Sequence, residues 1–305
     1  MIEAQGLSRR YGDFLAVNDV SFTIAPGEVV GLLGHNGAGK TTIMKMLTGF
    51  LEPTAGSVVV NGTDVTVDAE LVQSQLGYLP ESLPVYPEMT VSEYLAYAAA
   101  LRGCDPQSCV PWAISQTQLA DKATDPIDTL SRGYKQRVGV AQAILHRPSF
   151  LILDEPSNGL DPNQIQQMRQ LIRNLADHAT VILSTHIMQE VSAVCDRTLI
   201  LSNGRLALDE KLEELQKATE LRLKSDETLS VDGLAGVPDI GGVEQVVPGE
   251  WILAVTGDVD QACASVAKYV VEQAQPVYAL SPQKRDLENV FAELNNPVEE
   301  NAHAV

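Results

Sequence analysis

The sequence predicts an α/β fold with a central parallel β-sheet, followed by a smaller α+β domain. Three short and mostly apolar runs, 28–33, 150–153 and 179–185, indicate strands that are buried on both faces, which is typical of parallel sheets. Stretches with helical spacing of apolar residues lie between them. A chain of 305 residues also exceeds the usual size of one hydrophobic core, so two domains are expected.

The first strand runs into a loop that is unusually rich in glycine. Residues 34–41, "GHNGAGKT", fit the pattern G-x-x-x-x-G-K-[ST], and a helix follows that ends near Gly49. Bare backbone lets successive N–H groups surround phosphate oxygens, and the helix N-terminus adds partial positive charge. We expect Lys40 to reach the β- and γ-phosphates and the Thr41 hydroxyl to ligate Mg²⁺; the alternative is a glycine-rich turn without a ligand. The expected nucleotide contacts are Gly34, His35, Asn36, Gly37, Ala38, Gly39, Lys40, Thr41 and Thr42.

Two adjacent carboxylates end the second strand. Asp154 and Glu155 follow the apolar run 150–153, at the edge where a doubly wound sheet binds its ligands. Asp154 is expected to bind Mg²⁺, directly or through water, and Glu155 to polarise a water that attacks the γ-phosphate. A strand ending in Asp-Glu is common by itself, so this prediction depends on the glycine-rich loop that precedes it.

The third strand, "ATVILSTH", ends at His186. A lone histidine after an apolar strand is more often structural than catalytic. Its position changes that expectation, because the strand would lie beside the other two and bring the imidazole to the γ-phosphate. Lys40, Glu155 and His186 are therefore the expected catalytic residues.

Between these strands lies "LSRGYKQRVGVAQAIL", residues 130–145, which predicts an amphipathic helix with Ser131 as its N-cap. Together with the preceding motifs, it makes residues 1–220 resemble the ATP-binding subunit of an ABC transporter. "LSRGYKQR" is similar to the family signature, "GHNGAGKTT" to its Walker A loop, "LILDE" to its Walker B strand and "SNGLD" to its D-loop. Tyr11 matches the aromatic residue that stacks on adenine; the alternative is an aromatic that packs on the sheet.

The resemblance implies a P-loop NTPase core of the ABC ATPase type with an antiparallel β-subdomain and a helical subdomain at about 86–147. Thr90 to Glu93, "TVSE", fits a capping box and opens a helix that we expect to reach Leu101. That helix and the one at 131–145 would form the helical subdomain. In the family, this subdomain contacts the membrane subunit.

Two departures from the family pattern stand out. Arg132 and Tyr134 occupy positions of the signature where Gly and Gln are common, although Ser131 and Gly133 can still offer a hydroxyl and a backbone N–H to a γ-phosphate. Glu81 stands where the Q-loop usually has Gln; a carboxylate can ligate Mg²⁺ or orient water, but it adds negative charge beside a triphosphate.

The resemblance also implies partners. One Walker A loop and one signature cannot complete two composite sites, so a head-to-tail homodimer closed by ATP is expected. Integral membrane permease subunits would hold the protein at the cytoplasmic face of the cell membrane, and "YLPE" with "LSRGY" is typical of ABC-2 type export systems. The rival hypotheses are a soluble ABC ATPase that acts on nucleic acid or ribosomes, and a nucleotide-binding regulatory module without turnover.

Composition narrows these options. The formal net charge of −19 repels phosphate backbones, so no nucleic-acid partner is expected. The four cysteines form no CxxC motif, which indicates reduced thiols in a cytosolic protein. We find neither a secretory signal at the start nor about 18 consecutive apolar residues for a membrane span.

Residues 221–305 predict a separate small α+β domain. Segments "ELRLKS", "WILAVTG" and "PVYALSP" indicate strands and "VDQACASVAKYVVEQA" a helix, with a turn at Gly241-Gly242. The segment "RDLENVFAELNN" resembles the closing helix of exporter-type ATPase subunits. The domain shows no catalytic set, and its many acidic side chains form either a solvated face or a surface for a basic partner.

Overall fold

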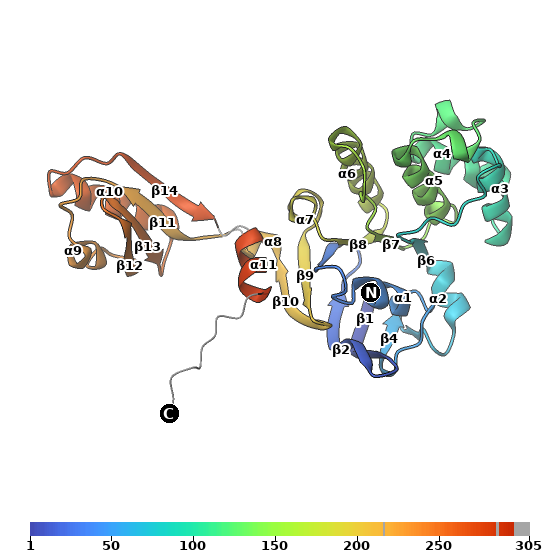
Figure 1. The fold of residues 1–305 in the computed structure, drawn as a ribbon, viewed down its shortest axis with the longest axis horizontal. Coiled ribbons are helices and arrows are strands. Elements are labelled where there is room, and N and C mark those ends of the chain that lie inside the picture. The colour runs from blue at the N-terminus through green and yellow to red at the C-terminus, as the bar shows by residue number, and fades with distance from the viewer. Residues whose placement is uncertain (216, 285–286, 296–305) are drawn as a thin grey trace. The chain divides into compact units, whose positions relative to one another are not determined.

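A computed structural model describes residues 1–215, 217–284 and 287–295, which form parts of two compact units, 1–212 and 213–305 (Figure 1). We refer to them as unit 1 and unit 2. The sequence placed the domain boundary at 220, which lies inside strand β11 (Ala218–Lys224).

A six-stranded sheet forms the centre of unit 1. All neighbouring strands in it are parallel except β9 and β10, which pair antiparallel. The strand order is β10-β9-β3-β8-β7-β6. The strands are β3 (Val29–Leu33), β6 (Leu76–Leu79), β7 (Phe150–Asp154), β8 (Thr180–Thr185), β9 (Arg197–Ser202) and β10 (Arg205–Lys211). The three apolar runs predicted as strands therefore lie side by side, and β3 and β7 flank β8.

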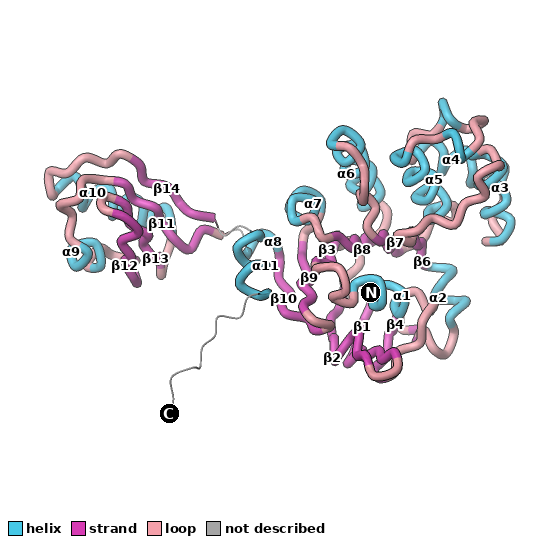
Figure 2. Tube along the Cα trace, in the orientation of Figure 1, coloured by secondary structure: helices cyan, strands magenta, loops and turns pink. Residues whose placement is uncertain are grey.

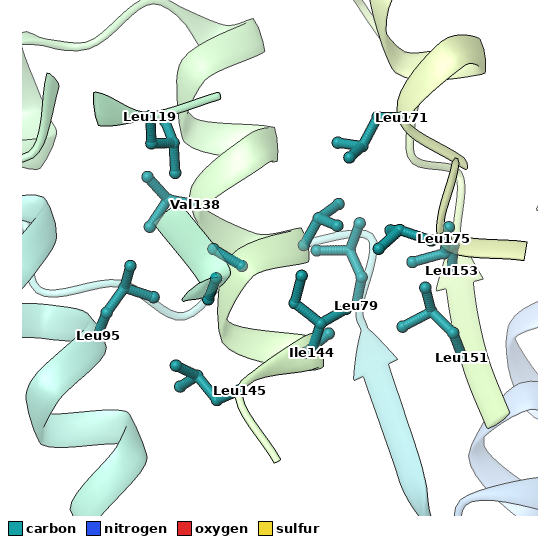
Figure 3. Packing of buried hydrophobic residues seen from close by; sticks show 14 of the residues in the cluster. Leu79, Leu95, Leu119, Val138, Ile144, Leu145, Leu151, Leu153, Leu171 and Leu175 are labelled. Carbon is teal, nitrogen blue, oxygen red and sulfur yellow. The ribbon is translucent and has the colours of Figure 1, made fainter. Parts of the chain in front are cut away.

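Each central strand sends alternate side chains into two separate cores, because successive residues of a strand point to opposite faces. Leu151 and Leu153 of β7 pack in the core on the helical side, which Figure 3 shows, whereas Phe150 and Ile152 pack in the other core. All five residues of β7 are buried. Burial on both faces explains why these strands are continuously apolar rather than alternating.

A second, antiparallel sheet covers one of these cores. Its order is β2-β1-β4-β5, formed by β1 (Ile2–Tyr11), β2 (Phe14–Ile24), β4 (Ala55–Val60) and β5 (Thr63–Asp64). Helix α1 (Lys40–Leu47) contributes Ile43, Met44 and Leu47 to the same core. Gly49 follows α1 at φ +69°, the conformation that commonly ends a helix. This sheet is the antiparallel β-subdomain that the family resemblance implied.

Helices α3 (Val91–Leu101), α4 (Pro106–Gln116) and α5 (Arg132–Ile144), with short 3₁₀ turns at Ala120–Lys122 and Ile127–Thr129, lie between β6 and β7 in the chain (Figure 2). The predicted capping box is present, since Thr90 and Glu93 bond each other's backbone N–H. Ser131 is the N-cap of α5, as its position predicted. The other helices of unit 1 are α2 (Ala69–Gln75), α6 (Pro162–Ala176) and α7 (Met188–Val194), and α8 (Leu212–Leu215) spans the boundary between the units.

Unit 2 has the element order β-α-β-β-α-β and an antiparallel sheet of order β12-β13-β11-β14, which is the ferredoxin-like topology. The two helices that lie between its strands in the chain pack on one face of the sheet, and Trp251 is fully buried in the core that they cover. The elements are β11, α9 (Val231–Ala235), β12 (Ile240–Val247), β13 (Glu250–Val255), α10 (Val259–Glu272), β14 (Ala279–Lys284) and α11 (Leu287–Asn295).

Two details of unit 2 differ from the sequence prediction. The pair Gly241-Gly242 lies inside strand β12 rather than in a turn. The register shifts between Ile240 and Gly242, and a Cβ on Gly241 would come within 2.5 Å of the Thr256 side chain, so close packing rather than chain reversal explains the glycine. Strand β14 also begins at Ala279, three residues later than the segment "PVYALSP" suggested.

Candidate functional site

The glycine-rich loop joins β3 to α1 and brings bare backbone close to the antiparallel sheet. Gly37 and Gly39 have φ of +85° and +106°, and a Cβ on Gly39 would come within 2.7 Å of the Ala16 carbonyl. Gly39 is also the N-cap residue of α1, and in the described part of the chain no side-chain hydrogen bond caps this helix. The first N–H groups of α1 are therefore available to an anion.

Lys40 is the first residue of α1, and its side chain is buried with an exposed fraction of 6%. Its ammonium donates to the carbonyl oxygens of Gly34 at 2.7 Å and His35 at 3.3 Å, and lies 3.4 Å from Glu155 Oε1. It can exchange these partners for phosphate oxygens without moving out of the loop.

Asp154, at the end of β7, is fully buried behind the loop. Its Oδ1 accepts hydrogen bonds from the hydroxyl groups of Ser184 and, at 3.5 Å, Thr41. Its Oδ2 is buried and has no hydrogen-bond partner in the part of the chain that the structure describes. A buried carboxylate oxygen without a partner is costly, and a hard cation would satisfy it. Together with the Thr41 hydroxyl, this oxygen donor set fits Mg²⁺, which takes few protein ligands and keeps several waters.

Glu155 has a left-handed backbone, with φ of +50°. Its N–H is held by the carbonyl oxygen of Ser184 at 3.1 Å and the Ser184 hydroxyl at 3.0 Å. Its carboxylate lies between two groups that can carry positive charge, with Oε1 near Lys40 and Oε2 at 2.9 Å from His186 Nδ1. The third predicted catalytic residue therefore joins the same cluster.

A cavity of about 460 Å³ opens over these residues. Most of the predicted site residues line it, whereas Gly34, Ala38 and Asp154 are buried and do not. The lining residues are Tyr11, Phe14, Ala16, His35, Asn36, Gly37, Gly39, Lys40, Thr41, Thr42, Glu81, Glu155, Asn158 and His186. Glu81 thus lies in the same cavity as Lys40 and Thr41, although no group of three or more His, Cys, Asp or Glu in the described ranges is placed to hold a metal.

Ser131 and Gly133 do not reach this cavity. They line a separate shallow recess, of about 50 Å³, between α5 and α6. Ser131 is exposed, and its hydroxyl caps α5 by accepting the N–H of Tyr134 at 3.5 Å. Arg132, which differs from the Gly that is common at this position of the family signature, has its guanidinium group against Gly159, in the loop that follows Glu155.

Four residues of the site were not named as site residues from the sequence, although Asn158 belongs to the segment "SNGLD". Phe14, Ala16 and Asn158 line the cavity, and Ser184 holds both carboxylate residues of β7 in place. Ser184 had a detectable signal, because a serine in an otherwise apolar and buried strand must find hydrogen-bond partners. Close to these groups, burial and the charges of Asp154 and Glu81 raise the pKa of Tyr78 well above its ordinary value.

The fold and this cavity define a phosphate-loop ATPase of the cassette type, and the comparisons agree. Residues 17–158 match the family described as "ABC transporter". The chain is 38% identical over 220 residues to an uncharacterized ABC transporter ATP-binding protein, YxlF of Bacillus subtilis. The aligned region covers 71% of this chain and 73% of YxlF. The chain belongs to the ABC transporter ATP-binding proteins and is an ATP-hydrolysing subunit of a transporter.

Two further comparisons extend this similarity. The bacitracin transport ATP-binding protein BcrA of Bacillus licheniformis is 30% identical over 299 residues, which cover 96% of this chain and 97% of BcrA. A solved ATP-binding subunit of an ABC transporter superposes with a TM-score of 0.64 at 32% identity, covering 71% of this chain and 92% of that one. The similarity to BcrA therefore includes unit 2. None of the helices in the described ranges combines the length and the apolar character needed to span a bilayer.

Proposed function

We propose that the chain binds MgATP in the 460 Å³ cavity, hydrolyses it as a homodimer, and powers an ABC-2 type exporter. The observation that carries this proposal is the convergence of Lys40, Asp154, Glu155 and His186 around the glycine-rich loop. Unit 1 would be the ATP-binding domain and unit 2 an accessory domain. Sequence motifs "YLPE" and "LSRGY" support the export assignment, and the similarity to a protein named for bacitracin transport supports a role in transport.

Each residue has a role that its position supports. The loop N–H groups and Lys40 would bind the β- and γ-phosphates, and Tyr11 would stack on the base. Asp154 and Thr41, with Glu81 as a further oxygen donor, would hold Mg²⁺, which when bound neutralises charge on the β- and γ-phosphates. The residues of the loop and of the start of α1 that would contact the nucleotide are Gly34, His35, Asn36, Gly37, Ala38, Gly39, Lys40, Thr41 and Thr42.

Glu155 would orient the attacking water and accept its proton as the water oxygen bonds to the γ-phosphorus. The bond from the γ-phosphorus to the β–γ bridging oxygen breaks, which yields ADP and inorganic phosphate. His186, whose Nδ1 lies 2.9 Å from Glu155 Oε2, would turn toward the γ-phosphate. Lys40 would release Glu155 in the same step, because phosphate oxygens replace the carboxylate as its partner.

Ser131 and Gly133 would act on the nucleotide of a second copy. Their distance from the cavity of their own chain supports this role, since neither lines it. An ATP held by one subunit and covered by the N-terminal end of α5 of the other would join the two copies, and hydrolysis would release them. Permease subunits would transmit this motion and hold the protein at the cytoplasmic face of the membrane.

The test combines binding, turnover and association. Lys40→Ala should abolish ATP binding or hydrolysis, because the ammonium is lost from the loop. Glu155→Gln should bind MgATP, fail to hydrolyse it, and accumulate as a dimer in analytical ultracentrifugation. Normal ATP hydrolysis by Glu155→Gln would refute its assigned role. Extraction in detergent should recover a membrane subunit with the chain, whereas sedimentation with ribosomes would favour the soluble alternative.

A further inference from the structure

The tip of the β1–β2 hairpin carries two large aromatic side chains at the mouth of the cavity. Tyr11 and Phe14 are cross-strand partners, and both line the cavity. Both are exposed, with exposed fractions of 45% and 64%. Two neighbouring aromatic side chains left in solvent beside a cavity mark a surface that a ligand covers.

One face of Tyr11 is already occupied. The Arg9 guanidinium carbon lies 4.9 Å from the centre of the Tyr11 ring, and Arg9 is anchored by a 2.9 Å hydrogen bond to the Glu52 carbonyl. A base can therefore stack on the opposite face of the ring only. The remaining apolar contacts of that base must come from elsewhere, and Phe14 is the aromatic side chain that pairs with Tyr11 across the hairpin and also lines the cavity.

We propose that Phe14 is a second base-binding residue, and that Tyr11 and Phe14 together hold a purine by aromatic and apolar contact. This inference rests on the proposed function, because it assumes that the phosphates occupy the glycine-rich loop. The nucleotide base would cover the exposed face of Phe14. The hairpin itself does not need an aromatic side chain at this position.

The same surface determines which nucleotides the site accepts. The hairpin contributes Tyr11, Phe14 and Ala16 to the cavity lining, and the Tyr11 hydroxyl is the sole side-chain donor or acceptor among these three. Strong rejection of one purine requires hydrogen-bonding groups that one base satisfies and the other leaves unpaired. The site should therefore take purine nucleoside triphosphates as a class, with less than about tenfold discrimination between ATP and GTP.

Calorimetry on the full chain with Mg²⁺ tests this, using ATP, GTP and inorganic tripolyphosphate as ligands. Phe14→Ala should weaken ATP and GTP binding about 5- to 50-fold, in the range of base–aromatic stacking. Tripolyphosphate binding should not change, because it has no base. Phe14→Trp should bind ATP as the wild type does, and Phe14→Leu should fall between. Phe50→Ala is the matched control, since Phe50 is 75% exposed and lies outside the cavity lining.

The outcomes separate this inference from the proposed function. If Phe14→Ala binds ATP as tightly as the wild type, or weakens tripolyphosphate equally, the inference is overturned and the proposed function stands. A wild type that binds no ATP refutes the proposed function itself. GTP binding more than about tenfold weaker than ATP binding overturns the predicted base tolerance. A loss of ATP-driven dimerisation in ultracentrifugation without a loss of binding would place Phe14 at a protein interface and overturn its assignment to the base.

Discussion

The contact between Lys40 and Glu155 should stabilise the nucleotide-free protein, and a double-mutant cycle measures by how much. The two side chains are 6% and 7% exposed and lie 3.4 Å apart. Coulomb's law gives roughly 5 kcal/mol for such a pair at an effective dielectric constant of about 20. Desolvation opposes this attraction, and His186 shares the carboxylate, so we expect a coupling free energy of about 2 kcal/mol.

The variants are Lys40→Met, Glu155→Gln and the double substitution. Hydrogen exchange of the β3 and β7 amides, without nucleotide, measures the opening free energy of this region in the full chain. Lys40→Met should lower this opening free energy more in the wild-type background than in the Glu155→Gln background. Only in the wild-type background does the substitution leave a buried carboxylate without its ammonium partner.

Lys122 and Asp125 provide the control pair. They are 2.9 Å apart but are 33% and 37% exposed, so their cycle should show little coupling. A coupling free energy between Lys40 and Glu155 that is indistinguishable from zero would refute the reasoning. In that case Lys40 would not stabilise Glu155 before ATP arrives, and its displacement by phosphate could not release the carboxylate.

Three further predictions concern stability. Burial, followed by the charge of Arg102, lowers the pKa of His146 to about 4. Between about pH 4 and pH 6.5 the unfolded chain therefore binds more protons than the folded one. The free energy of unfolding should decrease as the pH falls through that window. Urea titrations should show a loss of about 1–2 kcal/mol, reduced by partial exposure, that His146→Gln removes; equal pH dependence in both proteins would contradict this. Gly77→Ala should cost about 1–3 kcal/mol in the same assay, because a Cβ there would come too close to the Ala143 carbonyl; unchanged stability would show that the helix shifts freely. Ser184→Ala should weaken MgATP binding in calorimetry and cost about 1–3 kcal/mol, since it removes the hydroxyl that bonds Asp154; wild-type behaviour would exclude a positioning role.

The local chemistry of the site could be predicted from the sequence, because it depends on residues close together in the chain. Gly37, Gly39 and Lys40 belong to one loop, and their pattern predicted both the strand before it and the helix after it. The ends of the three apolar strands could be predicted as a common edge, since the carboxyl ends of parallel strands meet there. This placed Asp154, Glu155 and His186 in one site before any distance was known.

Contacts between distant segments could not be predicted in the same way. Phe14 reaches the cavity because its strand pairs with β1 opposite Tyr11, and Ser184 holds Asp154 because β8 pairs with β7 at that register. The Gly241-Gly242 pair has a composition typical of a turn, but it lies in strand β12 because that segment pairs with β13.

The sequence by itself predicted the class of chemistry, the catalytic residues to test and a division into a large and a small domain. Only the tertiary structure decided that Lys40 and His186 share Glu155, that one oxygen of Asp154 has no hydrogen-bond partner among the described residues, and that unit 2 has a ferredoxin-like topology. The physical reason is that glycine patterns and apolar runs act over a few residues, whereas strand register and side-chain packing depend on the whole chain at once.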